Sequence, residues 1–344
     1  MKSYRIAAIP GDGIGNEVIP AGIEVLNELA SGFELQFKTF DWGSDRYKRT
    51  GAYIPDGGLD ELKKFDAIFF GAVGAPDVPD HVSLWGLRLP ICQGFDQYAN
   101  VRPARILPGV KSVISNVDWV IVRENTEGEY SGSGGRVHTG LPEEVATETS
   151  VFTRKGVERV HRFAFELAKK RKKHLTLVTK SNAQRHGMVL WDEIFFEVAK
   201  SFPDVKTDRV LVDAMTTRMV LKPGSIDTVV ASNLHADILS DLAAALSGSL
   251  GIAPTANLTP ERKFPSMFEP IHGSAFDITG KGVANPIATF WTAAMMLEHL
   301  GQSKAATRLM KAIEKVTGDK VHTPDLGGAH DTRAVTNAVK RALD

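Results

Sequence analysis

The stretch Thr-Val-Val-Ala-Ser-Asn-Leu-His-Ala-Asp-Ile-Leu-Ser-Asp, residues 228–241, contains two periodic patterns in succession. Thr228–Ala231 is a short apolar run of the kind that forms a buried strand. From Ala236 to Leu246 the apolar residues recur at helical spacing. A strand that leads directly into a helix is the repeating unit of α/β folds, so this stretch predicts an α/β architecture with a largely parallel sheet.

The same alternation continues in both directions along the chain. Strands are expected at Ile6–Ile9, Ala67–Phe70, Trp119–Val122, Leu175–Val178 and Val210–Val212, and helices at Glu17–Ala30, Gly156–Lys170 and Met188–Ser201. The segment from about 128 to 149 differs, because it is rich in Gly and Ser and has no helical period. We expect it to be an excursion from the fold, either a β-arm or a lid.

Asp237 and Asp241 in the opening stretch lie one helical turn apart. Two like charges at positions i and i+4 destabilise a helix by a few tenths of a kcal/mol. A cation between the carboxylates would remove that repulsion, and hard oxygen ligands suit Mg²⁺ or Mn²⁺ rather than zinc. The alternative is a solvated polar stripe on an amphipathic helix, and the rest of the chain has to decide between the two.

Composition excludes several classes of protein. The 41 basic and 41 acidic side chains of the 344 residues cancel, so no global field favours nucleic acid or an anionic membrane. The basic cluster Lys169–Lys173 ends an expected helix and has no interleaved aromatic residues, so we interpret it as a solvated helix end. A single cysteine, Cys92, excludes an internal disulfide and a thiolate zinc site. The chain has neither a signal-peptide core nor an 18-residue apolar window, so we expect a cytoplasmic protein.

The glycine-rich loop Gly11–Gly15 follows the first expected strand and precedes the first expected helix. Its spacing, G-x-G-x-G, is not the G-x-G-x-x-G of dinucleotide-binding folds. It also lacks the Lys-Ser/Thr continuation of a P-loop, which disfavours a phosphate-binding transferase. A tight turn and a ligand loop remain equally compatible with this pattern.

Several polar residues fall at the ends of expected strands, where α/β sheets bind their ligands. Arg102 and Arg123 have the shape to hold carboxylates, although single arginines are commonly surface ion-pair partners. Lys180 could act as a base if desolvation or a metal lowered its pKa, and Tyr130 could donate a proton. Asp213 directly follows Val210–Val212 and could be a third metal ligand. This set suits oxidation of a 2-hydroxy acid with stabilisation of an enolate.

Several longer motifs follow one another along the chain: Ile-Pro-Gly-Asp-Gly-Ile-Gly-Asn-Glu (9–17), Asn-Val-Arg-Pro (100–103), Arg-Glu-Asn-Thr-Glu-Gly-Glu-Tyr (123–130), residues 233–241, Phe-Glu-Pro-Ile-His-Gly-Ser-Ala-Phe-Asp-Ile (268–278) and Gly-Lys-Gly-Val-Ala-Asn-Pro (280–286). In these motifs, and in their order, the chain resembles the β-decarboxylating dehydrogenases, the family of isopropylmalate, isocitrate, D-malate and tartrate dehydrogenases. Asp-His-Val-Ser-Leu-Trp-Gly (80–86), Phe-Asp-Gln-Tyr (95–98) and Asn-Leu-Thr-Pro-Glu-Arg (257–262) are most similar to the tartrate and D-malate branch.

The resemblance implies a two-domain isopropylmalate-dehydrogenase-like fold rather than a standard Rossmann fold. Residues 1–99 and 250–344 would form an NAD-binding terminal domain. Residues 100–249 would form a dimerisation, metal and substrate domain, with the segment 128–149 as a dimer-forming β-arm.

The resemblance also implies a homodimer in which each active site is shared. Lys180 and Asp213 of one subunit would meet Asp237 and Asp241 of the other. The three aspartates would then be the ligands of Mg²⁺ or Mn²⁺.

The family further implies a role for each remaining site residue. Arg102 and Arg123 would hold the substrate carboxylates. Lys180 would be the general base on the 2-hydroxyl, and Tyr130 would protonate the enol left by decarboxylation. Asn182 would lie near the nicotinamide.

NAD binding is expected in the C-terminal part of the chain. Asp277 would accept hydrogen bonds from the ribose hydroxyls, and a carboxylate there repels a 2′-phosphate, so the expected cofactor is NAD rather than NADP. The full expected set is Asn182, Glu269, His272, Gly273, Ser274, Ala275, Asp277, Ile278 and Asn285.

One departure from the family concerns substrate recognition. The family usually carries another substrate arginine about ten residues before Arg102, and here Cys92 occupies that position. Arg88 is the nearest arginine and precedes Pro90, a residue common in first helical turns. Our hypothesis is that Arg88 folds back into the site, or that neutral donors such as Gln93 contact the distal end of the substrate.

The sequence thus predicts an oxidoreductase that uses NAD and a divalent metal to oxidise and decarboxylate a small 2-hydroxy diacid such as tartrate or D-malate. One alternative is a 3-isopropylmalate dehydrogenase, and another is a non-catalytic regulatory subunit of a related enzyme. The sequence leaves open the preferred acid, whether decarboxylation follows every oxidation, Mg²⁺ or Mn²⁺, a requirement for K⁺, and any assembly beyond a dimer.

Overall fold

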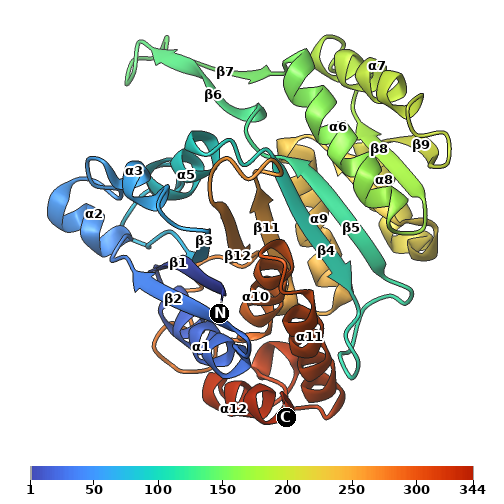
Figure 1. The fold of residues 1–344 in the computed structure, drawn as a ribbon. Helices are drawn as coiled ribbons and strands as arrows, with labels where there is room; N and C mark the ends of the chain where they lie inside the picture. Colours follow the sequence, from blue (N-terminus) through green and yellow to red (C-terminus); the bar gives the residue numbers. More distant parts are fainter. Residues whose placement is uncertain (1, 344) are drawn as a thin grey trace. The chain divides into compact units, whose positions relative to one another are not determined.

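The computed structural model of the protein describes residues 2–343, and the chain divides into two compact units. Unit 1 combines the described parts of 1–97, 105–113 and 244–344, so it contains both ends of the chain. Unit 2 is the middle of the chain, Tyr98–Ala104 and Ile114–Ala243. Figure 1 shows the path of the chain through both.

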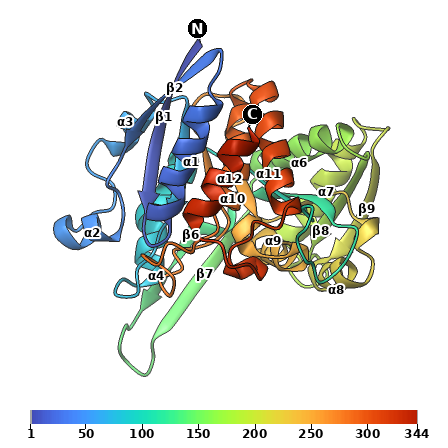
Figure 2. The same ribbon diagram turned by 90° about the horizontal axis from the view of Figure 1, so that it is seen from below.

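Unit 1 is a sheet with helices on both faces (Figures 1 and 2). Its strands have the order β2-β1-β3-β12-β11, all parallel except for the antiparallel pair β11 and β12. The strands are β1 Lys2–Gly11, β2 Phe33–Thr39, β3 Ala67–Ala72, β11 Pro254–Leu258 and β12 Ser266–Pro270. The longer helices are α1 Gly15–Leu29, α10 Ile287–His299, α11 Ser303–Gly318 and α12 Thr332–Ala342, and the shorter ones are α2 Ser44–Thr50, α3 Gly58–Leu62, α4 Asp80–Ser83 and α5 Leu89–Gly94. Single turns lie at Leu84–Arg88, Leu250–Ile252 and Pro324–Leu326.

Alternation along the strands of unit 1 produces two hydrophobic cores. Side chains of a strand point alternately to opposite faces. Ile6 and Phe69 pack into the core beneath α1, α10, α11 and α12. Ile9 and Phe70 pack into the core on the other face, with residues of α3 and α5. Because both faces are covered, these strands are continuously apolar rather than amphipathic.

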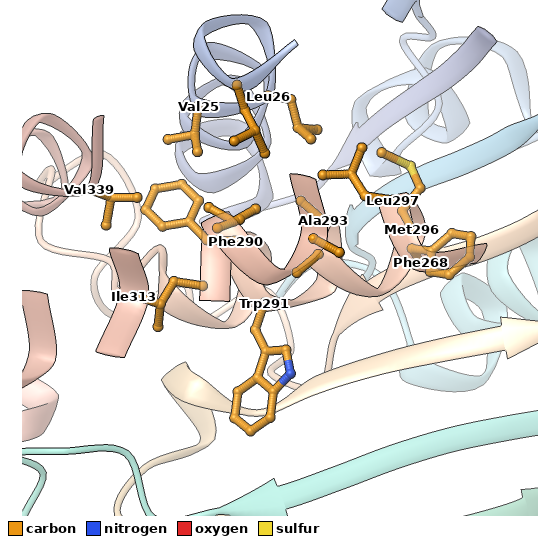
Figure 3. Packing of buried hydrophobic residues seen from close by; sticks show 14 of the residues in the cluster. Val25, Leu26, Phe268, Phe290, Trp291, Ala293, Met296, Leu297, Ile313 and Val339 are labelled. Carbon is orange, nitrogen blue, oxygen red and sulfur yellow. The ribbon is translucent and has the colours of Figure 1, made fainter. Parts of the chain in front are cut away.

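Helix α10 lies at the centre of the first core. Figure 3 shows Phe290 close to Val339 of α12 and to Val25 and Leu26 of α1, whereas Trp291 points to the opposite side of the helix. Phe290 is fully buried, and Trp291 is 8% exposed. Burying an aromatic side chain of this size contributes roughly 1.5–3 kcal/mol.

Unit 2 is built around strands in the order β4-β5-β10-β8-β9, of which β5, β10, β8 and β9 are parallel to one another. The strands are β4 Ala99–Arg105, β5 Asp118–Glu124, β8 His174–Thr179, β9 Lys206–Leu211 and β10 Thr228–Ala231, and the helices are α6 Arg154–Lys169, α7 Gly187–Ala199, α8 Val212–Leu221 and α9 Asn233–Ser247. A short turn lies at Pro223–Ser225. Figure 2 shows α6 and α7 on the opposite side of β8 from α8.

The segment around 128–149 forms an antiparallel pair, β6 Gly128–Val137 and β7 Val145–Val151, that extends away from the helices of its unit (Figure 2). The predicted β-structure of this segment is therefore confirmed. The two strands pair with each other and form a sheet of their own.

The predicted strands and helices are present, with one correction. Val212 was expected to end a strand but is the first residue of α8, so Asp213 lies in the first turn of that helix rather than directly after a strand. Leu211, in the extended conformation, is the residue that precedes the helix. Across residues 2–343, no helix has the length and apolar character needed to cross a membrane.

Candidate functional site

Two buried arginines of unit 2 converge on one carboxylate. Arg102 is 6% exposed and Arg123 is 2% exposed. Nη1 of Arg102 donates to Oδ1 of Asp237 at 3.0 Å, and Nη1 of Arg123 is paired with the same oxygen. A buried guanidinium is tolerated only when it is well paired. The pairing therefore fixes both cations on one side of α9.

Residues on one face of helix α9 bind the two arginines. Asn233, Asp237 and Ser240 follow each other at intervals of four and three residues, which places them side by side on a helix. Oδ1 of Asn233 accepts from Nε of Arg123 at 2.9 Å, and Oγ of Ser240 accepts from Nη1 of Arg102 at 2.7 Å. Arg102 lies inside β4 and Arg123 near the end of β5, so two neighbouring strands supply the guanidiniums.

Tyr130 joins the same carboxylate from the base of the arm. Its hydroxyl donates to Oδ2 of Asp237 at 3.1 Å, and the guanidinium of Arg123 lies 5.3 Å from the centre of its ring. The neighbouring Glu129 accepts from the backbone N–H of Leu234 at 3.1 Å and from Oγ of Ser232 at 2.8 Å. Glu129 thus caps the beginning of α9. We call Arg102, Arg123, Tyr130 and Asp237 the arginine–aspartate cluster.

Asp241 lies one turn beyond Asp237, and its side chain is 57% exposed. Its Oδ1 is 3.9 Å from Nη1 of Arg102. Partial burial and the negative charge of Asp237 raise the pKa of Asp241, whereas the two arginines lower it. The two carboxylates offer hard oxygen donors on one accessible helix face, and this donor chemistry fits Mg²⁺ or Mn²⁺.

Lys180 and Asp213 form a separate pair in unit 2. Nζ of Lys180 donates to Oδ1 of Asp213 at 2.5 Å. This hydrogen bond lowers the pKa of Asp213. Lys180 follows β8 directly, and its side chain is 29% exposed. Among residues 2–343, no three His, Cys, Asp or Glu side chains are grouped so that they could hold a metal.

In unit 1, the loop from 271 to 286 is anchored on the beginning of α1. The backbone N–H of Ile14 donates to the carbonyl of Ser274 at 2.9 Å, and the N–H of Gly280 donates to Oε1 of Glu17 at 2.7 Å. Ala284 packs with Ile14 in a small buried cluster. These contacts give the loop a defined conformation without regular secondary structure.

The same loop contains buried polar atoms that have no partner within the described chain, 2–343. They are Nε2 of His272 and Oγ of Ser274, which is 8% exposed. Buried polar groups are normally hydrogen-bonded, so such atoms call for a ligand or water. Burial lowers the pKa of His272, which keeps the imidazole neutral at pH 7. A Cβ at Gly273 would meet open space, and Asp277 is exposed.

The glycine-rich loop is a tightly packed turn. A Cβ at Gly11 would lie 1.9 Å from the carbonyl oxygen of Ala72, and a Cβ at Gly13 would lie 2.0 Å from that of Ser274. Both residues have positive φ angles, +72° and +55°. Backbone contact and conformation therefore require these glycines. Between them, Asp12 accepts from the N–H of Ser44 at 2.7 Å and from the N–H of Gly74 at 2.8 Å.

The structure places Arg88 and Glu269 in one buried network. Nε of Arg88 donates to Oε1 of Glu269 at 2.8 Å, and Nη2 lies 2.7 Å from the same oxygen. Asn257 donates to Glu269 at 2.7 Å and accepts from Arg88 at 3.3 Å. Cys92 is fully buried in the apolar core of unit 1, whereas Gln93, the next residue of α5, is partly exposed. Pro90 lies in the first turn of α5, as predicted.

Asn285 and Asn182 occupy different environments. Asn285 is 5% exposed, donates to Oδ2 of Asp325 at 3.0 Å and accepts from the N–H of Ile287 at the start of α10. Asn182 is exposed in the turn after β8. Ala275 adopts a positive φ of 43°. Ile278, whose N–H donates to the carbonyl of Ala275, packs on the cluster at Ile14.

Sequence reasoning missed the residues that orient the site. Asn100 accepts from Nε of Arg102 at 2.9 Å, and Asn233, Ser240 and Glu129 were likewise given no role. All four lie within or beside the motifs that hold the predicted site residues. The helical spacing of Asn233 and Ser240 from Asp237 was the available signal, because it places them on one face.

Comparison with known proteins gives a consistent result along the chain. Residues 5–340 match the model of the isocitrate/isopropylmalate dehydrogenase family. A probable tartrate dehydrogenase/decarboxylase of Agrobacterium vitis is 68% identical, covering 100% of this chain and 97% of the relative. The decarboxylating D-malate dehydrogenase of Escherichia coli is 50% identical over 100% and 99%. The crystal structure of isocitrate dehydrogenase from Methylococcus capsulatus matches with a TM-score of 0.90 at 36% identity, covering 99% of both chains.

Proposed function

Because the chain belongs to the isocitrate/isopropylmalate dehydrogenase family, we propose that it oxidises a small 2-hydroxy diacid, tartrate or D-malate, with NAD and Mg²⁺ or Mn²⁺, and decarboxylates the product in the cytoplasm. Its relatives named tartrate dehydrogenase/decarboxylase and D-malate dehydrogenase support this substrate class. In this proposal, unit 1 binds NAD, and unit 2 supplies the metal ligands and the arginines that hold the carboxylates of the diacid.

One observation carries the proposal: two buried guanidiniums and a tyrosine hydroxyl meet on Asp237, one turn from Asp241. The two arginines and two aspartates together carry no net charge. A divalent cation and a dianionic substrate also cancel each other, so both can enter without leaving an uncompensated charge in a partly buried site. Arginine is well suited to this role because its planar fork binds carboxylates bidentately.

Lys180 and Tyr130, the latter from the arginine–aspartate cluster, are suited to the proton transfers of the reaction. A bound divalent ion would supply Lewis acidity at the substrate oxygens, and NAD would accept the hydride from C2. Lys180, in its neutral amine form, would take the proton of the 2-hydroxyl as the hydride leaves C2. After CO₂ departs, Tyr130 donates its hydroxyl proton to the enolate carbon. Tyr130 is held for this step by Asp237, with the cation of Arg123 at its ring.

The 271–286 loop supports the choice of dinucleotide. Nε2 of His272 and Oγ of Ser274, which have no partner among residues 2–343, provide hydrogen-bonding groups for an adenosine ligand. The exposed carboxylate of Asp277 would accept from ribose hydroxyls and repel a 2′-phosphate, which favours NAD over NADP. Glu269 and Asn285 are already hydrogen-bonded within unit 1, so they would support the cofactor site by holding neighbouring residues in place.

The departure at Cys92 supports recognition of a short diacid. Arg88 is committed to Glu269 and Asn257, and Cys92 is buried in an apolar core, so Gln93 is the partly exposed polar group of this segment. We assign Gln93 to the distal end of the substrate and Cys92 to the packing of α5. A neutral donor at this point suits the hydroxyl or carboxylate of tartrate or malate.

The metal and catalytic groups support a homodimer with shared sites. Asp213 is paired with Lys180, whereas Asp237 is paired with the arginines, so the two carboxylates belong to separate sets of contacts. Helix α9 exposes Leu234 and Ile238 next to its aspartates, 36% and 53% exposed. Helix α8, which begins beside Asp213, exposes Val220 and Leu221, 44% and 71% exposed. Covering these apolar side chains with a second copy would bring Asp213 and Lys180 to the Asp237–Asp241 pair.

The test is a substrate panel with the purified chain. D-malate, the tartrate stereoisomers, isocitrate and 3-isopropylmalate are each supplied with NAD and Mn²⁺, and NADH and CO₂ are measured separately. The proposal expects NADH formation with D-malate or a tartrate, and CO₂ in equal amount where decarboxylation follows.

Two controls define the outcome. EDTA should abolish turnover, and Mn²⁺ should restore it, because the ion would be held by accessible carboxylates. The proposal would be contradicted if the chain oxidised only 3-isopropylmalate or isocitrate. It would also be contradicted if the chain oxidised none of these acids at saturating Mn²⁺ and NAD.

A further inference from the structure

The turn that carries Lys180 and Asn182 is fixed by main-chain hydrogen bonds. The N–H groups of Ala183 and Gln184 both donate to the carbonyl of Lys180 at 2.9 Å. The N–H of Ser181 donates to Oγ1 of Thr179 at 3.2 Å. The turn therefore has a defined shape and a bond to the end of β8, but these bonds do not tie it to β9.

A triangle of side chains supplies that tie. Oγ of Ser181 donates to Oδ2 of Asp192 at 2.6 Å, and Nη1 of Arg209 donates to the same oxygen at 2.9 Å. Nη1 of Arg209 also lies 3.1 Å from Oγ of Ser181. Ser181 belongs to the turn, Asp192 to α7 and Arg209 to β9, so the triangle joins three elements of unit 2.

Asp192 is a buried carboxylate among the apolar residues of α7. It is 8% exposed, and its Oδ1 has no hydrogen-bond partner among residues 2–343. A buried carboxylate adds little stability compared with an apolar side chain of similar volume, because desolvation offsets the pairing. Its neighbours on the helix, Trp191 and Ile194, are buried apolar residues. The position of Asp192 therefore serves Ser181 and Arg209 rather than the core.

The elements that meet at Asp192 are those that deliver the proposed base and metal ligand. Ser181 lies between Lys180 and Asn182 in the sequence. Strand β9 continues from Arg209 into α8, whose second residue is Asp213. Asp213 is the carboxylate that accepts from Lys180 at 2.5 Å. A contact that locks the turn to β9 therefore also sets the distance between Lys180 and Asp213.

We propose that Asp192 is a positioning residue: through Ser181 and Arg209 it holds the turn of Lys180 and Asn182 against β9. This inference rests on the proposed function, which makes Lys180 the base. A general base works only within hydrogen-bonding reach of its proton, and a misplacement of about 1 Å lowers the rate roughly 100-fold. Loss of the triangle affects catalysis rather than the binding of the diacid, which the arginines hold.

The test compares Ser181→Ala, Asp192→Ala and the double variant. Each single variant should lower kcat roughly 10- to 100-fold with the KM for the diacid within about twofold. The double variant should fall no further than Asp192→Ala, because both substitutions break the same contact. Asp192→Asn retains an oxygen acceptor for Ser181 and Arg209, so it should keep kcat within a few-fold of the original chain. Glu193→Ala is the matched control, since Glu193 is the exposed neighbouring carboxylate on α7.

Two results would overturn the proposal. One is an unchanged kcat in both single variants of a chain that oxidises its diacid. The other is a loss confined to Asp192→Ala together with a lower unfolding temperature, because that pattern describes a structural role without Ser181. Ser181→Ala removes a single hydroxyl and leaves the Arg209–Asp192 pair, so it separates the two roles even if Asp192→Ala folds poorly.

Amide hydrogen exchange distinguishes failure of this inference from failure of the proposed function. The N–H groups of Ala183 and Gln184 should exchange at least several-fold faster in Ser181→Ala, whichever acid the protein oxidises. Faster exchange supports the positioning role without any turnover measurement. Unchanged exchange at both amides would contradict it, and the substrate panel would still stand.

Discussion

The arginine–aspartate cluster of unit 2 and the 271–286 loop of unit 1 differ in how far their polar groups are hydrogen-bonded within the protein. In the cluster, Arg102, Arg123 and Tyr130 all bind Asp237, so its charges are already paired. In the loop, His272 and Ser274 each keep a buried polar atom without a partner in the described chain.

This difference follows from what each region would bind. A small dianion with a metal needs charges fixed in advance, because reorganising charged groups during the reaction would raise the barrier. A dinucleotide can instead satisfy neutral donors and acceptors when it arrives. Substitutions in the cluster should therefore reduce catalysis strongly, and substitutions in the loop should weaken cofactor binding modestly.

The largest effect is expected from Arg123→Met in the cluster. Removing one guanidinium leaves Asp237 underpaired and removes a proposed partner of the substrate carboxylates, so kcat/KM for the diacid should fall about 10³-fold, equivalent to about 4 kcal/mol. Steady-state NADH formation measures this. Arg162→Met is the control, because Arg162 is half-exposed and pairs with Glu158 on the surface of α6. An equal fall in kcat/KM in both variants would show that the cluster contributes no more to catalysis than a surface ion pair.

A smaller effect is expected from Asp277→Lys in the loop. Replacing the carboxylate with a cation should raise the ratio of kcat/KM for NADP to that for NAD by roughly 10-fold or more, since a 2′-phosphate would be attracted rather than repelled. Asp56→Lys makes the same charge change at an exposed position elsewhere in unit 1 and should leave the ratio unchanged. No change in the ratio for Asp277→Lys would remove this residue from the cofactor site.

Two buried serines allow the comparison to be made with one type of substitution. Ser240→Ala removes the 2.7 Å bond to Arg102 and should lower the free energy of unfolding by about 1 kcal/mol. Ser274→Ala removes no internal bond of its hydroxyl, so stability should stay within about 0.5 kcal/mol while KM for NAD rises roughly 2- to 10-fold. Denaturant unfolding and NAD titrations measure both. If Ser274→Ala also destabilised the fold, its hydroxyl would have an internal role.

The smallest effect on activity is expected from His161→Phe on α6, outside both regions. Burial lowers the pKa of His161 to about 3, and its ring packs edge-on against Trp191 and Phe195. Between about pH 6.5 and this value the unfolded chain binds the proton and the folded chain does not, so the free energy of unfolding falls as pH falls. From pH 6.5 to pH 5 the loss is about 2 kcal/mol.

The phenylalanine variant should lose this acid sensitivity while kcat/KM at pH 7 stays unchanged. Urea unfolding at pH 5, 6 and 7 gives the comparison, and the slope of stability against pH should be smaller in His161→Phe. Equal slopes in the two proteins would mean that His161 is not the group that titrates.

Much of the fold could be predicted from the sequence because buried strands and amphipathic helices leave clear periodic patterns. Ile6–Ile9 and Ala67–Phe70 are apolar throughout, as strands covered on both faces must be. Val212 was misplaced because Val-Leu-Val is typical of a strand, whereas the chain turns into a helix at the last valine. Periodicity does not reveal such a boundary.

The site was harder to predict because its geometry depends on contacts distant in sequence. Asp237 and Asp241 were recognisable from their spacing, but nothing local indicated that two arginines more than 100 residues earlier would share one oxygen of Asp237. The roles of Glu129 and Asp192 also depend on the folded chain, since each acts on a different element.

The central claim is that the Asp237–Asp241 pair is half of a site that a second copy completes with Lys180 and Asp213. Mixing two inactive variants, Lys180→Met and Asp241→Asn, and allowing subunits to exchange tests it directly. Each mixed dimer would then contain one intact site, so activity should return to about a quarter of the original level. If the mixture stays as inactive as each variant alone after the subunits have exchanged, all the groups of a site come from one chain and the claim is wrong.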